Sequence, residues 1–389
     1  MKPLQGMRVV SIEQFGAAPY GTMLLAELGA EVIKIENAET GGDPARHVGP
    51  HMLGPADSQY FQAWNLGKRS VTLDIKSPEG RRQFEALVRR ADAVVNNLRG
   101  NLPGRLGLDY LALKRVNPAL VCLHISAYGR DNERAAWPGY DYLMQAETGL
   151  MSLTGEPDGP PARVGASLVD TMTGMTGMIG LLSAVLQARQ SGIGCDVDTC
   201  LFDVAMHQLS YPAMWYLNEG DASRRLSRSS HLSLVPVQTF PTADGWIFVM
   251  CMTEKFWRVF CDGIGRPDLP EDPRFASFGA RRDNRAALTA ILDAELRKAP
   301  TGRWLQILGG QLPVAPVHDL PEALDSSFVR ANGLVRSVPH PAKPEMQVLA
   351  NPLKFNGVRP GQSACASLGA DNAALLQQEE PATPAGGAA

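Results

Sequence analysis

The first 126 residues alternate short apolar strands with helical segments, and this alternation limits the possible folds more than any other feature. Residues 7–13 (MRVVSIE), 31–36 (EVIKIE), 70–75 (SVTLDI), 93–97 (AVVNN) and 120–126 (LVCLHIS) have the composition of buried strands. Helical patterns cover residues 19–28, 78–90 and 109–115. Because strands separated by helices form parallel sheets covered on both faces, the sequence predicts an α/β fold.

Ligands of such sheets bind beyond the carboxyl ends of the strands. Those ends are residues 14–18, the loop after Asn97, and residues 127–140. A dinucleotide site is one interpretation, because Glu36 ends the second strand as a ribose-binding acid would. The first turn, GAAPYG at residues 16–21, lacks the G-x-G-x-x-G pattern, since Ala18 replaces the second glycine and Pro19 removes an N–H group. We therefore expect no nicotinamide or flavin cofactor.

The character of the chain changes near residue 219. A polar, basic stretch at 223–233 is followed by two strand patterns joined at Asp244-Gly245, which predicts a hairpin. We expect a large domain over residues 1–222, a smaller α+β domain over 223–312, and a return segment over 313–360 that completes the large domain. An amphipathic helix is expected at 201–218. Residues 361–389 are rich in alanine, glycine, proline and glutamine, which predicts a flexible tail.

The composition excludes several classes of protein. Hydrophobic residues make up 44% of the chain, and a net charge of −3 argues against a nucleic-acid binder. The seven histidines and six cysteines show no metal-ligand spacing, so we expect no metal site. The start of the chain lacks a signal-peptide pattern, and no apolar run approaches about 18 residues. We therefore predict a cytoplasmic protein with reduced thiols and no membrane partner.

Residues 160–190 begin as a loop and continue as a helix from Asp170. Gly174, Gly177 and Gly180 recur every three residues, and a glycine inside a helix costs roughly 1 kcal/mol relative to alanine. Another helix or a bulky ligand must therefore approach this helix closely. Asp170 has two interpretations. It is either an N-cap, or a reactive carboxylate whose ionised form the helix N-terminus favours.

Several stretches together resemble the family III CoA-transferases, which include formyl-CoA transferase. They are AAPYGTMLLAELGAEVIKIE (17–36), NLGKRSVTLDIKSPEG (65–80), RLGLDYLAL (105–113), PGYDYLMQAETGLMSLTG (138–155), the helix from Asp170, VPVQTFPTADG (235–245) and VAPVHDL (314–320). The resemblance spans residues 4–356. It implies a Rossmann-like large domain built from both ends of the chain, a smaller α+β domain, and a homodimer of interlocked chains.

The resemblance also implies a mechanism and a site. The aspartate that matches Asp170 is the family's nucleophile, which forms an aspartyl-CoA thioester while CoA passes from an acyl-CoA to a carboxylic acid. Neither a metal nor a redox cofactor is needed. By the same match, Leu73 and Lys76 lie near the CoA adenine and phosphates, and Arg105 pairs with a phosphate. The full set of positions expected to bind CoA is Phe15, Gly16, Leu73, Lys76, Asn97, Leu98, Arg99, Arg105, Tyr140 and Asp141.

The chain departs from formyl-CoA transferase at two positions. Asn37 replaces an arginine after the second strand, and Gly16 replaces a glutamine near the reacting carbonyl. The glycine-rich lid of the small domain also has no counterpart. The pattern is closer to transferases that use succinyl-CoA or similar donors with a dicarboxylate acceptor. Two alternatives stay open: an α-methylacyl-CoA racemase of the same fold, whose histidine would fall at Tyr140, and a non-catalytic CoA-binding protein.

Overall fold

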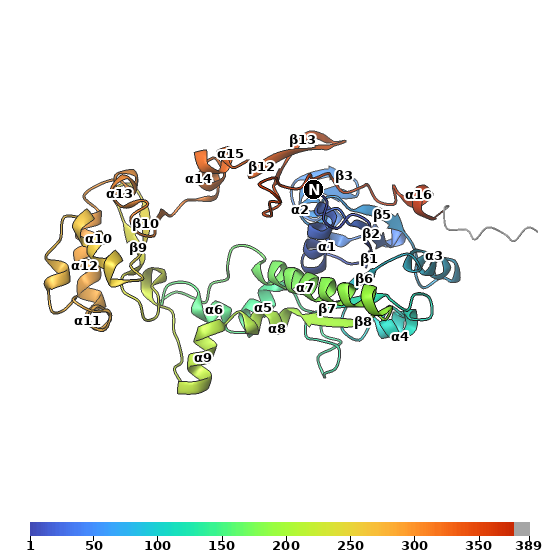
Figure 1. Cartoon of the computed structure of the whole chain (residues 1–389), viewed down its shortest axis with the longest axis horizontal. Helices are drawn as coiled ribbons and strands as arrows, with labels where there is room; N and C mark the ends of the chain where they lie inside the picture. Colours follow the sequence, from blue (N-terminus) through green and yellow to red (C-terminus); the bar gives the residue numbers. More distant parts are fainter. Residues whose placement is uncertain (377–389) are drawn as a thin grey trace, which may run out of the picture. The chain divides into compact units, whose positions relative to one another are not determined.

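The computed structural model describes residues 1–376, which form two compact units (Figure 1). The first unit contains residues 1–148, 165–208 and 328–376, and the second contains residues 149–164 and 209–327. Each unit is described by itself.

The first unit is built on a six-stranded sheet in which every pair of neighbouring strands is parallel. In spatial order the strands are β5 (Arg69–Thr72), β2 (Glu31–Glu36), β1 (Arg8–Ile12), β6 (Ala93–Asn96), β7 (Val121–Ser126) and β8 (Cys195–Cys200). Numbered within the sheet, the order is 3-2-1-4-5-6, which is the order of Rossmann folds. The predicted α/β class and parallel sheet are therefore confirmed. The strand order reverses between β1 and β6, where such sheets open a crevice for ligands.

Both faces of this sheet are covered. Helix α3 (Pro78–Val88), capped by the Ser77 hydroxyl, packs Phe84 into a buried cluster with Val94 and Cys122. Helices α1 (Ala17–Glu27) and α7 (Leu168–Ser191) pack on each other, and α7 also contacts β7 and β8. Leu123 and Ile125, which alternate with Cys122 along β7, lie against Gly177 of α7. Alternate side chains of one buried strand thus serve both layers.

The glycines of α7 allow this close packing. A Cβ on Gly174 would lie 2.5 Å from the carbonyl oxygen of Ala17 in α1. Cβ atoms on Gly177 and Gly180 would approach Ile125 and Val197 to 3.0 and 2.9 Å. A second helix and the sheet, rather than a ligand, therefore account for the glycine spacing.

Helix α7 is the one helix within residues 1–376 that is long and apolar enough to cross a membrane, by length and composition alone. Its contacts with α1, β7 and β8 account for part of this apolar character. Met175, Ile179 and Leu186 of this helix are exposed. The cytoplasmic location stays a prediction.

The second unit has its own sheet and core. Strands β9 (Val237–Pro241), β10 (Trp246–Met250) and β11 (Val314–Pro316) form an antiparallel sheet in the order β11-β10-β9, so the predicted hairpin is confirmed. Four helices surround its buried cluster around Trp257, Phe260 and Leu292. They are α10 (Glu254–Gly263), α11 (Phe278–Asp283), α12 (Arg285–Leu296) and α13 (Thr301–Leu308).

The structure divides the chain at other places than the sequence predicted. The expected helix over 201–218 is two helices, α8 (Leu201–His207) and α9 (Ser210–Glu219), because Ser210 has a left-handed φ of +53°. The division between the units falls at 208/209 instead of 222/223. The second unit extends to residue 327 rather than 312 because β11 pairs with β10, and it also takes in residues 149–164 with helix α6 (Leu150–Leu153).

The prediction of a flexible tail from residue 361 was wrong for residues 361–376. Asp371 accepts hydrogen bonds from Arg69 and from the backbone N–H of Ser70, and Asn372 bonds Thr72 of β5. Leu375, in the short helix α16 (Asn372–Leu376), is buried in the core. These partners lie about 300 residues away in sequence, so local composition could not reveal them. Residues 377–389 lie outside the described residues.

The remaining elements are short. Strands β12 (Val335–His340) and β13 (Lys343–Leu349) form a hairpin whose Val338 and Met346 pack with Met23 and Leu66. The others are β3 (Met52–Gly54), β4 (Asp57–Ser58), α2 (Gln59–Asn65), α4 (Tyr110–Leu113), α5 (Asp141–Glu147), α14 (Leu320–Leu324) and α15 (Ser327–Ala331).

Candidate active site

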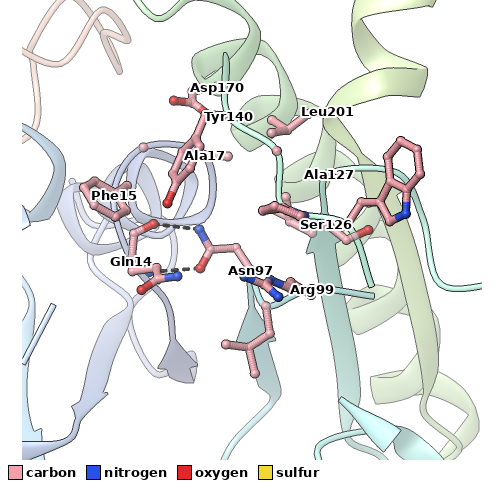
Figure 2. Close-up of a pocket in the computed structure, with 16 residues that line it drawn as sticks. Gln14, Phe15, Ala17, Asn97, Arg99, Ser126, Ala127, Tyr140, Asp170 and Leu201 are labelled. Carbon is pink, nitrogen blue, oxygen red and sulfur yellow. Dashed lines mark hydrogen bonds between the residues drawn. The ribbon is translucent and has the colours of Figure 1, made fainter. Parts of the chain in front are cut away.

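A cavity of about 140 Å³ opens at the carboxyl ends of β1, β6 and β7 (Figure 2). One part of its wall comes from the segments that follow these strands: residues 14–17 after β1, residues 97–99 after β6, and Ser126 and Ala127 at the end of β7. Residues 137–140, Asp170 and Leu201 complete it. The cavity lies where the strand order reverses, at the edge that the sequence predicted for ligand binding.

The loop after β1 is held in an unusual conformation. Phe15 has a φ of +59°, a left-handed value that strains a residue with a side chain. Asn97 accepts the N–H of Gln14 at 2.9 Å and donates to its carbonyl at 2.7 Å, as Figure 2 shows. The N–H of Phe15 donates to Asp43 at 3.2 Å. These side chains from other parts of the unit impose the geometry of the loop.

A buried group of charges lies behind this loop. The Lys34 ammonium is 2.9 Å from Asp43 and donates to the carbonyl of Glu13 at 2.8 Å. Burial opposes its charge, but the carboxylates of Asp43 and Glu13 outweigh burial and raise the pKa of Lys34. Lys68 donates to Glu13 at 2.8 Å, yet burial dominates and lowers the pKa of Lys68 to about 8. Because breaking a buried ion pair leaves an uncompensated charge, this group fixes the loop firmly.

Asp170 lies in the first turn of α7, as the third helical residue, and is therefore not the N-cap. Ser167 occupies that position and makes no side-chain capping bond. The N–H of Asp170 donates to Asp141 at 2.9 Å. A Cβ on Gly16 would lie 2.3 Å from Asp170 Oδ2, so only glycine lets the loop approach the carboxylate this closely. The capping interpretation is thus contradicted.

The environment of Asp170 changes its acidity. Burial and the neighbouring charge of Asp141 raise the pKa of Asp170 to about 7. Asp141, at the start of α5, is buried and also accepts a bond from Gln145 at 2.6 Å. In contrast, the oxygens of Asp170 accept no hydrogen bond from another residue within 1–376. A carboxylate with unused lone pairs at the wall of a cavity is suited to nucleophilic attack.

The structure brings most of the predicted residues together. Six of the residues predicted to bind CoA line the cavity together with Asp170: Phe15, Gly16, Asn97, Leu98, Arg99 and Tyr140. The carboxylate of Asp141 accepts the backbone N–H of Asp170 and so supports the position of Asp170. Leu73 is buried in the sheet core, and neither Lys76 nor Arg105, both exposed, lines the cavity. Their roles toward the distal parts of CoA stay predictions. Arg99 is exposed, and it is the single cation among the described lining residues.

The sequence reasoning missed two aromatic residues, Trp137 and Tyr60. Trp137 lines the cavity, and Phe15 packs edge-to-face on Tyr140 at 5.7 Å. Partial burial and the negative charge of Asp170 raise the pKa of Tyr60 in α2, so its hydroxyl remains a donor. Tyr60 belongs to no recognisable local pattern, because only the fold brings it within the electrostatic influence of Asp170.

Glu36, at the end of β2, is engaged by another side chain of the first unit. Glu36, which could have been a ribose-binding acid, accepts two bonds at 2.7 Å from the Arg46 guanidinium. Among residues 1–376, no group of three histidine, cysteine, aspartate or glutamate side chains is placed to hold a metal ion.

Comparison with known proteins identifies the family. The model of CoA-transferase family III matches residues 4–372. The chain is 34% identical over 338 residues to the succinate–glutarate CoA-transferase of Agrobacterium fabrum. This alignment covers 85% of this chain and 84% of the relative. It is 34% identical over 358 residues to the acetyl-CoA:oxalate CoA-transferase of Acetobacter aceti, covering 91% and 90% of the two chains.

A solved structure agrees with this match. The crystal structure of a CAIB/BAIF family protein from Brucella suis has a TM-score of 0.84 and 32% identity, and the alignment covers 97% of this chain and 100% of that chain. The chain therefore belongs to CoA-transferase family III. It is a CoA-transferase that acts on acyl-CoA and carboxylic acid substrates.

Proposed function

We propose that this enzyme moves CoA from succinyl-CoA to a short dicarboxylate, glutarate in the first instance, through a covalent intermediate on Asp170. One observation carries the proposal: the unpaired carboxylate of Asp170 lies in a cavity at the carboxyl edge of the parallel sheet. The names of two similar enzymes, one acting on succinate and glutarate and one on oxalate, support a dicarboxylate acceptor.

The reaction proceeds through four exchanges at carbonyl carbons. Asp170 attacks the thioester, which gives a mixed anhydride and CoA thiolate. The thiolate then attacks the aspartyl carbonyl, releases succinate and leaves an aspartyl-CoA thioester. The acceptor carboxylate displaces the thiolate from that carbonyl, and the thiolate attacks the new acyl group and frees Asp170. Each thioester bond broken is replaced by another, so no external energy source is required.

The geometry suits this chemistry. The first N–H groups of α1 have no acceptor within the helix, and Gly16 and Ala17 at this end line the cavity. Such groups favour negative charge, which develops on the carbonyl oxygen during each attack. With a pKa near 7, Asp170 is both partly ionised and more nucleophilic than an ordinary aspartate at neutral pH. Arg99 is a further donor for the substrates.

The nucleotide end of CoA is assigned to residues outside the cavity. We place its phosphates near Lys76 and Arg105, whose exposed side chains follow β5 and β6 at the same edge of the sheet. Asn37, at the corresponding end of β2, supplies no charge there.

Trapping the intermediate tests the mechanism. Succinyl-CoA without an acceptor should build up the aspartyl thioester, and hydroxylamine should then modify the peptide that contains Asp170. Asp170→Asn should abolish both the modification and transfer to glutarate, because an amide is a poor nucleophile. Asp203→Asn, in the first turn of α8, is the matched control and should behave as wild type. Modification at Asp141, or transfer by the Asp170→Asn variant, would contradict the proposal.

We further propose that the enzyme is a homodimer of interlocked chains. Large apolar side chains are exposed on both units, including Ile179 at 69%, Leu217 at 76% and Phe328 at 71%. A second copy would cover such surfaces, which monomeric proteins rarely leave open. Analytical ultracentrifugation at nanomolar concentration should find only dimers, because interlocked chains cannot separate without unfolding. A folded monomer would rule out the interlocking.

A further inference from the structure

A second cavity, of about 300 Å³, lies wholly within the second unit and has no part in the chemistry above. Its wall comes from residues 153–155, from the start of α9, and from the loop over residues 224–232. The residues that bear on its chemistry are Tyr211, Pro212, Arg224, Ser229, His231 and Leu232.

The protonation of His231 is set by the backbone. Its Nδ1 accepts the N–H groups of Ser233 at 3.1 Å and Leu234 at 3.0 Å, so the proton of the neutral ring is on Nε2. The ring stacks on Tyr211 at 5.7 Å between centroids. Burial and the charge of Arg285 lower the pKa of His231, which keeps the ring neutral at pH 7. His231 therefore offers one N–H donor at the cavity wall.

Arg224 differs from the other arginines of this loop. Arg225 donates to the carbonyl of Pro160 at 2.8 Å, and Arg228 pairs with Asp293. Arg224 is exposed and has no hydrogen-bond or ion-pair partner within the described residues. Arg228 (φ +63°) and Ser229 (φ +53°) of the same loop are consecutive left-handed residues.

The charge of this cavity is not balanced from within. None of its described lining residues is an aspartate or glutamate, and the nearby Glu156 is occupied by the N–H of Arg228 at 2.7 Å. The cavity thus combines one guanidinium, one neutral N–H donor and the free Ser229 hydroxyl with apolar walls from Pro212 and Leu232. A single cation with planar, paired donors suits a carboxylate, and the apolar walls suit methylene groups.

We propose that this cavity binds one carboxylate of a short aliphatic acid, with Arg224 as its charged partner and His231 Nε2–H as the second donor. The existence of an anion site here does not depend on the transferase mechanism. The choice of a dicarboxylate such as glutarate as the ligand rests on the proposed function. The phosphates of CoA are the other anion in the reaction, but they carry more charge than one guanidinium balances.

Calorimetric titration of the whole protein with glutarate, in the absence of CoA, tests this site. Wild type should bind glutarate, and Arg224→Gln and His231→Asn should each weaken binding at least about tenfold. Asparagine keeps an oxygen acceptor near the Nδ1 position but has no donor at Nε2, so the loop should remain folded. Arg258→Gln, which removes an exposed arginine of α10 in the same unit, is the control and should bind as wild type.

Three results of these titrations of wild type and the two variants would overturn the proposal. They are no glutarate binding by wild type, equal binding by wild type and both variants, or an effect of the variants on adenosine 3′,5′-bisphosphate alone. A separate titration of Asp170→Asn distinguishes the two cavities, because this variant should retain glutarate binding. Loss of binding there would place the ligand beside Asp170 instead. Failure of the transferase proposal would appear in the transfer assay and leave the titrations unchanged.

Discussion

Replacing Asp170 by asparagine should stabilise the folded protein at pH 8 while it abolishes CoA transfer. Burial and the charge of Asp141 raise the pKa of Asp170 from 3.8 to about 7. Between about pH 4 and 7 the folded chain therefore retains a proton that the unfolded chain has released, so stability falls as the pH rises through this window. Asparagine has no charge to desolvate, and the variant escapes this loss.

The size of the effect follows from the shift. A rise of about 3 in the pKa of Asp170 lowers the free energy of unfolding by about 4 kcal/mol if the whole rise reflects the folded state. Because the Asp170 side chain is only partly buried, solvent screens part of this energy. We expect a gain of about 1–2 kcal/mol at pH 8 and none below about pH 4. A gain of this size raises the Tm of the first unit by about 2–8 °C.

Differential scanning calorimetry of wild type and Asp170→Asn between pH 4 and 8 measures this difference. Asp203→Asn corrects for the loss of a negative charge in the first turn of a helix, which by itself destabilises by about 0.3–1 kcal/mol. A Tm difference that is independent of pH, or a less stable variant at pH 8, would refute the pKa and the burial argument behind it.

Four further predictions concern the first unit. The kcat/KM of wild type should rise with pH through about 7, as Asp170 ionises; a flat profile would contradict this. Gly16→Ala should lower kcat at least about tenfold through its clash with Asp170, whereas Gly302→Ala, in open space, should be silent. Asp43→Asn should lower the free energy of unfolding in urea by about 3 kcal/mol, since it removes the carboxylate closest to the buried Lys34 ammonium. Arg105→Ala should raise KM for CoA esters by the equivalent of about 1–3 kcal/mol with little change in kcat, and an unchanged KM would remove Arg105 from the site.

Much of the first unit could be predicted because its signals are local. Residues 31–36 match β2 (Glu31–Glu36) in full, and Ser77 caps α3 as its sequence pattern indicates. In a parallel sheet the carboxyl ends of all strands meet at one edge. Residues 14–17 and 97–99 could therefore be expected to share a site before their contacts were known.

The errors arose where distant contacts overrule local patterns. Residues 361–376 have the composition of a flexible tail, yet they bond β5 about 300 residues away. The break between α8 and α9 depends on a left-handed Ser210, a conformation that non-glycine residues adopt rarely and that the local sequence does not signal. The second unit takes in residues 313–316 because β11 pairs with β10, which no local pattern shows.

The sequence by itself determined the parallel α/β architecture and its ligand-binding edge, because strand and helix periodicity are local properties. Its resemblance to a known family singled out Asp170 as the candidate nucleophile, which the periodicity alone left open. Only the tertiary structure decided that Asp170 is a first-turn residue beside Gly16 with a pKa near 7. It also decided that Asp43 and Asn97 hold the strained Phe15 loop. Burial, and charges brought together from distant segments, set these properties, and neither can be read from the neighbours of a residue along the chain.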